Sequence, residues 1–427
     1  MTIPFRKVRN ILSARWSIAW RQKRVSTTPI VAFLEVSNVC NIRCQMCATT
    51  FDPRFQKGSG YTGLMDISVT DRLEPILPKL WRAYLMGNGE PLLNTHFLDF
   101  ARRLKHYKVE IQFNTNGMLL TPEISEELVA IGTDAIAISI DGADAETFNS
   151  IRRGADFDQV VGHIKALNQI KAQKQADKPH LSMAVVALKD NYQQMPRLVQ
   201  LAKDLGMGHV HVESLMWQDD LEYQKYYNEH ALIEDPSFNF PPDTGGKDKS
   251  DPPFIPPCNS RGEKIHPPSF PPYWRRGEGS SPPFGSPSAS RIIGTINRGE
   301  NGQDLTEQVP PLLEARNKAK DLRIGFSSPL LDNLRTKQTV GIPCWEPWTT
   351  IFVTWQGEIH PCCGSEQRMG NLQEQDITDI WNSMLYQQLR KDIIQKNIPE
   401  GCRICIKNQR MKRVIPTFTQ WIRKKIS

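Results

Sequence analysis

Three cysteines near the start of the chain have a spacing that suits a metal cluster. Cys40, Cys44 and Cys47 are separated by three and by two residues, so one short loop can carry all three thiolates. A structural metal site usually has four ligands, whereas a catalytic site leaves one position open for a small molecule. The three thiolates therefore predict a [4Fe–4S] cluster with one open iron. A zinc site or three buried thiols is the alternative, but zinc needs a fourth ligand and the nearest histidine, His96, is distant in sequence.

Five of the other six cysteines form a second group towards the C-terminal end. They are Cys344, Cys362, Cys363, Cys402 and Cys405. Seventeen residues separate Cys344 from Cys362, and two separate Cys402 from Cys405. Four thiolates can complete a coordination shell, so this group predicts a second metal site. From the residues alone, a four-cysteine zinc ribbon and an iron–sulfur cluster are equally good interpretations, and the spacing permits either Cys362 or Cys363 as a ligand.

The elements that must position these cysteines follow a repeating pattern. Between Ile30 and about Met216, short β-rich runs alternate with longer helical segments, which is typical of parallel βα units. The predicted strands are 31–37, 82–87, 110–116, 135–141, 181–188 and 209–214. The predicted helices are 94–106, 121–131, 156–174 and 192–205, each with apolar residues three and four apart. The sequence thus predicts an α/β fold, a partial (β/α)6 TIM-like barrel, with the first cysteine loop at the strand ends where reactive groups converge.

Composition divides the chain into five parts. A basic N-terminal extension takes 1–28 and the barrel takes 29–235. The Pro-, Gly- and Ser-rich part, 236–310, is predicted to be a low-complexity insertion, because its prolines remove backbone donors and its few aromatics cannot form a core. It contains Cys258, which we interpret as an exposed thiol without a function. A connector with a helix at 312–322 and a strand at 323–327 takes 311–342, and the cysteine-rich domain takes 343–427.

The bulk composition is that of a soluble globular protein. Of the 427 residues, 39% are hydrophobic and 23% charged, and no apolar run reaches the roughly 18 residues that cross a bilayer. The N-terminus lacks the apolar segment and cleavage site of a secretion signal, so we predict a cytoplasmic location. The formal charge of +7 has its excess in Arg6–Arg24 and Lys407–Lys425, which is weak support for nucleic acid, and we predict none. These basic flanks could touch a membrane surface peripherally, although solvated helix faces are the simpler interpretation.

Polar residues and glycines follow several predicted strands. Residues 87–90, Gly-Asn-Gly-Glu, follow the second strand, where glycines let the backbone approach a ligand and the carboxylate can receive an ammonium group. Asn116 ends the third strand, and Ser139 and Asp141 end the fourth, where amide and hydroxyl groups can meet a ribose or a carboxylate. For Asn116 and Asp141, an Asx turn into the next helix is an equal alternative. Arg152 can pair with a carboxylate or remain solvated.

Together these motifs resemble the radical S-adenosylmethionine (SAM) superfamily, whose signature is Cys-x3-Cys-x2-Cys in the loop after the first barrel strand. The resemblance implies that Cys40, Cys44 and Cys47 hold a [4Fe–4S] cluster whose open iron is chelated by the amino and carboxylate groups of SAM. It also implies SAM contacts for five other residues. These are Gly89 and Glu90 of a Gly-Gly-Glu-like motif, Asn116, Ser139 and Arg152.

The surroundings of the second cysteine group resemble the SPASM/Twitch domains of radical SAM enzymes. The matching text includes Pro-Cys-Trp-Glu-Pro-Trp at 343–348, Gly-Glu-Ile-His-Pro-Cys-Cys at 357–363 and Cys-Arg-Ile-Cys at 402–405. A full SPASM domain carries more cysteines and two auxiliary clusters, so the spacing fits the short, single-cluster version. The resemblance implies an auxiliary [4Fe–4S] cluster on Cys344, Cys362, Cys402 and Cys405, with Cys363 as a packed neighbour.

The resemblance also implies an activity. A flavodoxin or ferredoxin would supply one electron to the first cluster, SAM would be cleaved to a 5′-deoxyadenosyl radical, and this radical would abstract hydrogen from a substrate. The auxiliary cluster would accept an electron or anchor the substrate. The substrate is either a peptide or a small, sugar-like molecule, and the sequence does not separate the two. The alternative from another class is a non-catalytic iron–sulfur or zinc protein used for sensing or as a scaffold.

Overall fold

The computed structural model describes residues 4–55, 59–215, 226, 229–231, 310–328, 344–365, 367–397, 399 and 402. The predicted insertion at 236–310 lies outside the described residues except for Pro310. Cys258, Cys405 and the basic segment Lys407–Lys425 also lie outside them.

Six parallel strands form the centre of one large sheet, and all six are predicted by the sequence. In spatial order they are β1 (Val31–Leu34), β3 (Arg82–Leu85), β4 (Glu110–Thr115), β5 (Ala135–Ser139), β7 (His180–Ala187) and β8 (His209–Ser214). Buried and partly exposed residues alternate along most of them, because successive side chains point to opposite faces of a sheet. The buried set, with Leu34, Phe113 and Ile138, belongs to the main hydrophobic core. The other set lines the inner face of the partial barrel.

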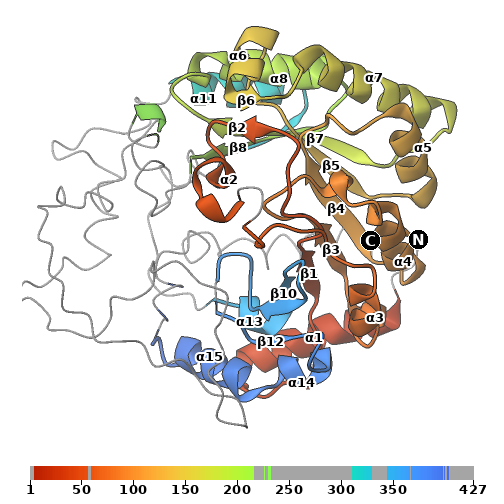
Figure 1. Cartoon of the computed structure of the whole chain (residues 1–427), viewed down its shortest axis with the longest axis vertical. Coiled ribbons are helices and arrows are strands. Elements are labelled where there is room, and N and C mark those ends of the chain that lie inside the picture. Colours follow the sequence, from red (N-terminus) through yellow and green to blue (C-terminus); the bar gives the residue numbers. More distant parts are fainter. Residues whose placement is uncertain are drawn as a thin grey trace, which may run out of the picture.

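Helices cover the outer face of this sheet (Figure 1). They are α3 (Val69–Leu73), α4 (Phe97–His106), α5 (Pro122–Ile131), α6 (Ala145–Ile151), α7 (Phe157–Gln173), α8 (Met195–Asp204) and α11 (Pro310–Asp321), with short 3-10 turns η2 (Leu77–Lys79), η3 (Pro91–Leu93) and η4 (Tyr192–Gln194). Side-chain caps fix three of the starts, because Thr121, Asp144 and Asp156 each accept a hydrogen bond from the amide three residues later. The four helices predicted between the strands are therefore present.

Two strands from later in the chain extend the sheet at its edges. β9 (Gly325–Ser327) pairs in parallel with β8, and β10 (Thr350–Val353) pairs in parallel with β1. β11 (Glu358–His360) and β12 (Gly370–Asn371) then continue from β10 as antiparallel strands. The edges of an open sheet present unpaired backbone groups, and these strands cover the edges left by the six-stranded core. The predicted connector strand at 323–327 is thus part of the barrel sheet.

The remaining C-terminal elements are small helices held together by one buried arginine. They are α13 (Glu346–Thr349), α14 (Ile377–Trp381) and α15 (Met384–Ile394). Arg390 is fully buried and donates hydrogen bonds to the carbonyl oxygens of Pro347, Lys23 and Trp381, each at 2.9 Å. Its guanidinium also lies over the Trp381 and Tyr386 rings. Arg390 therefore ties the C-terminal helices to the N-terminal segment.

The N-terminal extension contains a long helix, α1 (Phe5–Ala19), which Figure 1 shows in red near the C-terminal elements. Asn10 donates to the carbonyl oxygen of Thr28 at 3.0 Å and accepts from its amide at 3.0 Å, just before β1. The Lys7 ammonium donates to the carbonyl oxygen of Lys108 at 2.7 Å, just before β4. The helix thus lies at the N-terminal ends of the barrel strands. In the part of the chain that the structure describes, no helix is long and apolar enough to cross a membrane.

Candidate iron–sulfur and SAM site

The first three cysteines lie together in the loop that follows β1. Cys40, Cys44 and Cys47 share a small hydrophobic cluster with Ile42 and Met46. Burial raises the pKa of Cys40 and Cys44, the latter to about 12, and the neighbouring thiols add to both shifts. The cysteines that the spacing predicts as one ligand set are therefore brought into electrostatic range of one another. Metal binding to such thiols displaces their protons, so affinity rises with pH.

Cys44 is positioned by a short ladder between two distant segments. β2 (Arg43–Cys44) pairs with β6 (Arg152–Arg153), and Cys44 lies opposite Arg152. The Arg152 side chain donates from Nη1 to the Cys44 sulfur at 3.6 Å, and its Nε lies 2.7 Å from Oδ2 of Asp141. Asp141 is fully buried and also accepts from the amide of Val186 at 2.7 Å. Arg152 is thus engaged within the chain by a carboxylate and a sulfur.

The Gly-Asn-Gly-Glu turn packs directly on the backbone of the cysteine loop. The amide of Gly89 donates to the carbonyl oxygen of Ser37 at 3.2 Å, and that of Glu90 donates to Val39 at 2.8 Å. A Cβ on Gly89 would lie 2.2 Å from the carbonyl oxygen of Val39, which is far inside van der Waals contact. Glycine is therefore required at this position by the close approach of two backbones.

The Glu90 carboxylate connects this turn to the end of β4. It is 2% exposed and accepts hydrogen bonds from the Thr115 hydroxyl and the Asn116 amide, both at 2.8 Å. Burial raises the pKa of Glu90, and these donors oppose the rise. The Asn116 side chain in turn donates to Oδ1 of Asn41 at 2.8 Å and to the Cys40 sulfur at 3.8 Å. Glu90 and Asn116 thus reach the loop that carries the cysteines.

Ser139 is the last residue of β5 and lies on the inner face of the barrel. It is in register with Ala184 of β7, which is in register with His211 of β8. Neighbouring strands are about 4.8 Å apart, so His211 lies about 10 Å across the sheet from Ser139. Ala184, between them, has a small side chain on the same face of the sheet.

A chain of polar groups on β8 and β9 was not identified from the sequence. The Ser327 hydroxyl lies 2.8 Å from Nε2 of His209 and 2.6 Å from Nδ1 of His211. Nε2 of His211 lies 2.5 Å from Oε1 of Glu213. The alternation His-Val-His-Val-Glu at 209–213 was the available signal, because it places the polar residues on one face of a strand. Ser327 lies 116 residues from His211, so no local pattern indicates its part.

Glu35 is a second functional candidate that the sequence reasoning missed. It follows β1 directly, is buried, and accepts from the side chain of Asn88 at 3.2 Å and from the amide of Trp355 at 3.5 Å. Burial raises the pKa of this carboxyl group. Asn88 belongs to the glycine-rich turn and Trp355 to the turn between β10 and β11. Glu35 therefore links the candidate SAM site to the C-terminal domain.

The second cysteine group is described in part. Cys344 and Cys402 are half-buried, Cys362 is buried and Cys363 is exposed, and none of the described cysteines forms a disulfide. Cys362 lies two residues after β11, and its charge adds to the rise in the pKa of Tyr386 that burial causes and that Arg390 opposes. Cys405 lies outside the described residues. Cys362 and Cys363 therefore differ in burial, a difference that their spacing in the sequence does not reveal.

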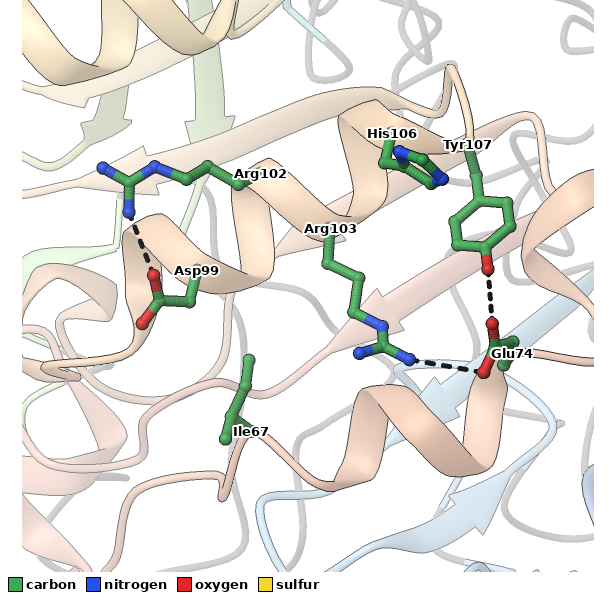
Figure 2. A pocket seen from close by; sticks show the side chains of 7 residues that line it. All are labelled: Ile67, Glu74, Asp99, Arg102, Arg103, His106 and Tyr107. Carbon is green, nitrogen blue, oxygen red and sulfur yellow. Dashed lines mark hydrogen bonds and ion pairs between the residues drawn. The ribbon is translucent and has the colours of Figure 1, made fainter.

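Figure 2 shows a pocket on the outer surface, between α3 and α4. Its charged groups are paired with one another: Arg102 with Asp99 at 2.9 Å, and Arg103 with Glu74 at 3.4 Å. None of its lining residues is a predicted site residue, and Figure 2 shows Arg102 paired with Asp99, and both Arg103 and Tyr107 bonded to Glu74. We therefore do not assign it to the cofactor site.

Comparisons with known proteins agree with this geometry. A family model described as the radical SAM superfamily matches residues 34–211, and the SPASM model, described as an iron-sulfur cluster-binding domain, matches residues 344–406. Residues 34–211 are thus a radical SAM domain, and residues 344–406 are a SPASM domain. The predicted family is confirmed, and so are its cofactors: a [4Fe–4S] cluster with SAM in the core domain, and iron–sulfur in the SPASM domain.

Curated relatives match over part of their length. A tungsten-containing aldehyde ferredoxin oxidoreductase cofactor-modifying protein of Pyrococcus furiosus is 30% identical over 189 residues, covering 43% of this chain and 51% of that protein. The mycofactocin maturase MftC of Mycolicibacterium smegmatis is 27% identical over 182 residues, covering 42% of this chain and 43% of that protein. The chain thus spans about half the length of the curated relatives it matches.

Solved structures share the fold. Streptococcus suis SuiB bound to S-adenosylmethionine aligns with a TM-score of 0.55 at 14% identity, covering 89% of this chain and 72% of that chain. SuiB bound to the precursor peptide SuiA aligns with a TM-score of 0.54 at 13% identity, covering 91% of this chain and 72% of that chain. The predicted fold class is confirmed as an α/β fold with a mostly parallel, partial barrel sheet.

Proposed function

We propose that the chain is an enzyme that cleaves SAM reductively and uses the resulting radical to abstract hydrogen from a substrate held inside the barrel. When bound, the [4Fe–4S] cluster and SAM supply the 5′-deoxyadenosyl radical. One observation carries the proposal: the Cys40, Cys44 and Cys47 thiols all lie in the loop after β1, within electrostatic range of one another, with the Gly89–Glu90 turn packed on that loop. Three thiol groups that can bind iron and the backbone of the Gly89–Glu90 turn thus lie beside each other at the end of β1.

The chain's own residues would orient the cofactors. Arg152 and Asn116 each direct an N–H group at a cysteine sulfur, and hydrogen bonds to sulfur are one means by which proteins tune iron–sulfur potentials. Gly89 and Glu90 would receive the SAM amino group, and Asn116 and Ser139 its ribose. Arg152 would receive the SAM carboxylate while keeping Asp141 as its partner. Preorganised donors of this kind orient a ligand without further reorganisation.

The C-terminal cysteines would hold the auxiliary [4Fe–4S] cluster through Cys344, Cys362, Cys402 and Cys405. The burial of Cys362 and the exposure of Cys363 support the choice of Cys362. Glu35 connects this domain to the SAM turn through Asn88 and Trp355, so the two sites would respond to each other's position. A flavodoxin or ferredoxin would supply the first electron, and the auxiliary cluster would accept a second one or anchor the substrate.

The substrate, a peptide or a small sugar-like molecule, would lie on the inner face beside β8. His211 lies about 10 Å from Ser139 and is paired with Glu213, so an imidazole and a carboxylate would be within reach of a molecule lying over Ala184. In a two-electron oxidation Glu213 would receive the proton that the substrate releases, and the bound cofactors would supply the one-electron chemistry. The His211–Ser327–His209 chain would stabilise the proton received there.

The first experiment is anaerobic reconstitution of the full chain with iron and sulfide, followed by SAM and dithionite. We expect about eight irons per chain and release of 5′-deoxyadenosine. A triple variant with Cys40, Cys44 and Cys47 changed to Ala should retain about four irons and form no 5′-deoxyadenosine. Iron without any SAM cleavage in the wild type would instead support a scaffold or sensor, and about one zinc would support a zinc protein.

The substrate is then sought by deuterium transfer into 5′-deoxyadenosine from labelled candidate peptides and sugars. With a substrate identified, Glu213→Gln should lower product formation while leaving the substrate-free cleavage of SAM unchanged. Equal losses in both assays would assign Glu213 to the SAM site and refute its role as the proton acceptor.

A further inference from the structure

The outward face of α1 carries an unusual row of large apolar side chains. Phe5 is 76% exposed, Leu12 54%, Trp16 60% and Trp20, which ends the helix, 64%. In the part of the chain that the structure describes, seven large hydrophobic side chains are exposed, and these are four of them. At 3.6 residues per turn, positions 5, 9, 12, 16 and 20 lie on one line along a helix. These five residues, including Arg9, are named the aromatic stripe.

Aromatic rings are concentrated at one end of the stripe. The Trp16 and Trp20 rings lie 5.3 Å apart between centroids, and they form one exposed indole pair. Indole rings are enriched at membrane interfaces, where their apolar body and their N–H group are accommodated together. Most exposed hydrophobic residues occur singly and require no explanation, but a contiguous row of this kind marks an interaction surface.

The charged residues of α1 and of the segment that follows it are all positive. Residues 1–24 contain seven Lys or Arg and no Asp or Glu. Arg9 lies within the stripe, and Arg6 and Arg15 are exposed on its two sides. Basic residues beside an apolar helix face are the composition of interfacial helices that lie on anionic membranes. A neutral protein partner would match the apolar row but not this charge.

The opposite face of α1 is firmly packed. Lys7, Asn10, Ile11, Ala14 and Ser17 are buried, and two of them bond to the segments that precede barrel strands. The helix is thus a fixed part of the fold, and the stripe faces away from the core. The helix lies at the N-terminal ends of the strands, whereas the cysteine loop follows the C-terminal end of β1. Docking through the stripe would therefore leave the candidate SAM site directed away from the docked surface.

We propose that the aromatic stripe docks the protein peripherally on an anionic lipid surface. The Trp16–Trp20 pair, Phe5 and Leu12 would enter the headgroup region, while Arg6, Arg9 and Arg15 contact lipid phosphates. The stripe would recognise phosphate groups that lie above a hydrocarbon layer, and a lipid bilayer is the surface that supplies both. This proposal concerns where the protein binds, and it does not depend on the reaction proposed above.

The test is co-sedimentation of the reconstituted full-length protein with vesicles under anaerobic conditions. Vesicles of phosphatidylcholine mixed with phosphatidylglycerol are compared with vesicles of phosphatidylcholine alone, at low and at high salt. We expect binding to the anionic vesicles, a blue shift of tryptophan emission on binding, and loss of both in high salt. Failure of the wild-type protein to bind the anionic vesicles would overturn the proposal.

Variants then locate the surface. Changing Trp16 and Trp20 together to Ala should weaken binding at least about tenfold, since two large apolar groups no longer enter the interface. Changing Arg6, Arg9 and Arg15 to Gln should weaken binding by about fivefold for each arginine.

A matched control changes Met384 and Leu385 to Ala, because these side chains are also exposed, at 80% and 48%, but lie on α15. This control should bind as the wild type does, and a loss equal to that of the Trp variant would refute the assignment to α1. Gel filtration distinguishes a second copy as occupant: a wild-type dimer that the Trp variant abolishes would also refute lipid docking. Iron content and 5′-deoxyadenosine release, measured on the same samples, report folding independently.

Discussion

Replacing Arg152 by Met tests how the cysteine loop is held. The change removes the cation that lies 2.7 Å from Asp141 and that donates to the Cys44 sulfur. Asp141 is fully buried, and among the described residues the Val186 amide is the donor that its carboxylate then keeps. Breaking one side of a buried ion pair costs about 3–5 kcal/mol, because the remaining charge is uncompensated. We expect this loss of stability at the β2–β6 ladder, which positions Cys44.

The double variant Arg152→Met with Asp141→Asn separates charge from packing. The amide oxygen of Asn can still accept from the Val186 amide, and neither charge of the Arg152–Asp141 pair remains. We expect the double variant to lose only about 1–2 kcal/mol, less than either single variant. The single-variant costs are therefore far from additive, as expected for residues in contact.

Hydrogen exchange followed by mass spectrometry on the reconstituted full chain measures these costs under native conditions. A loss of about 3 kcal/mol corresponds to roughly a hundredfold faster exchange, seen at the Val186 amide and at the Gln45 amide, which donates to Ile151. Amides of α5, away from this pair, should exchange at the wild-type rate. Equal exchange in Arg152→Met and in the double variant would refute the reasoning, because the unpaired carboxylate would then carry none of the cost.

Three further predictions follow from the packing. Gly89→Ala should abolish 5′-deoxyadenosine release, because the added Cβ displaces the turn from the cysteine loop. Gly162→Ala is the control, since Gly162 on α7 has open space around it, and it should leave the release unchanged. Equal activity of the two variants would contradict the steric argument. Arg390→Met removes the hydrogen-bond donors of three carbonyl groups, and we expect it to lower the free energy of unfolding by about 3–5 kcal/mol. The loss should appear as a lower melting temperature and as faster proteolysis of residues 20–25. An unchanged melting temperature would contradict this role of Arg390. Burial lowers the pKa of Lys7 to about 8 from 10.5, so its charged form costs stability below pH 8 and the cost disappears as pH rises from 8 towards 10.5. The stability of the wild type relative to Lys7→Met should therefore increase between pH 7 and pH 10 in denaturation experiments, and a constant difference would refute the assignment.

The sequence by itself determined the strands and the ligand candidates, because these depend on local spacing. Alternating and apolar runs predict all six central strands, and the spacing of Cys40, Cys44 and Cys47 requires only one loop. The turn at Gly89 was also predictable, since a glycine-rich segment after a strand indicates close backbone approach. Each of these inferences concerns residues within a few positions of each other.

The tertiary structure decided what joins these pieces. Arg152 meets Cys44 across 108 residues, and Trp355 meets Glu35 across 320. β9 and β10 extend the two edges of the barrel sheet, because an open sheet has unpaired backbone groups at its edges. The local sequence of these short strands does not indicate which edge each of them pairs with. Which buried charge finds which partner depends on the topology that brings distant segments together. The partners of Asp141 and Glu35 therefore became known only from the folded chain.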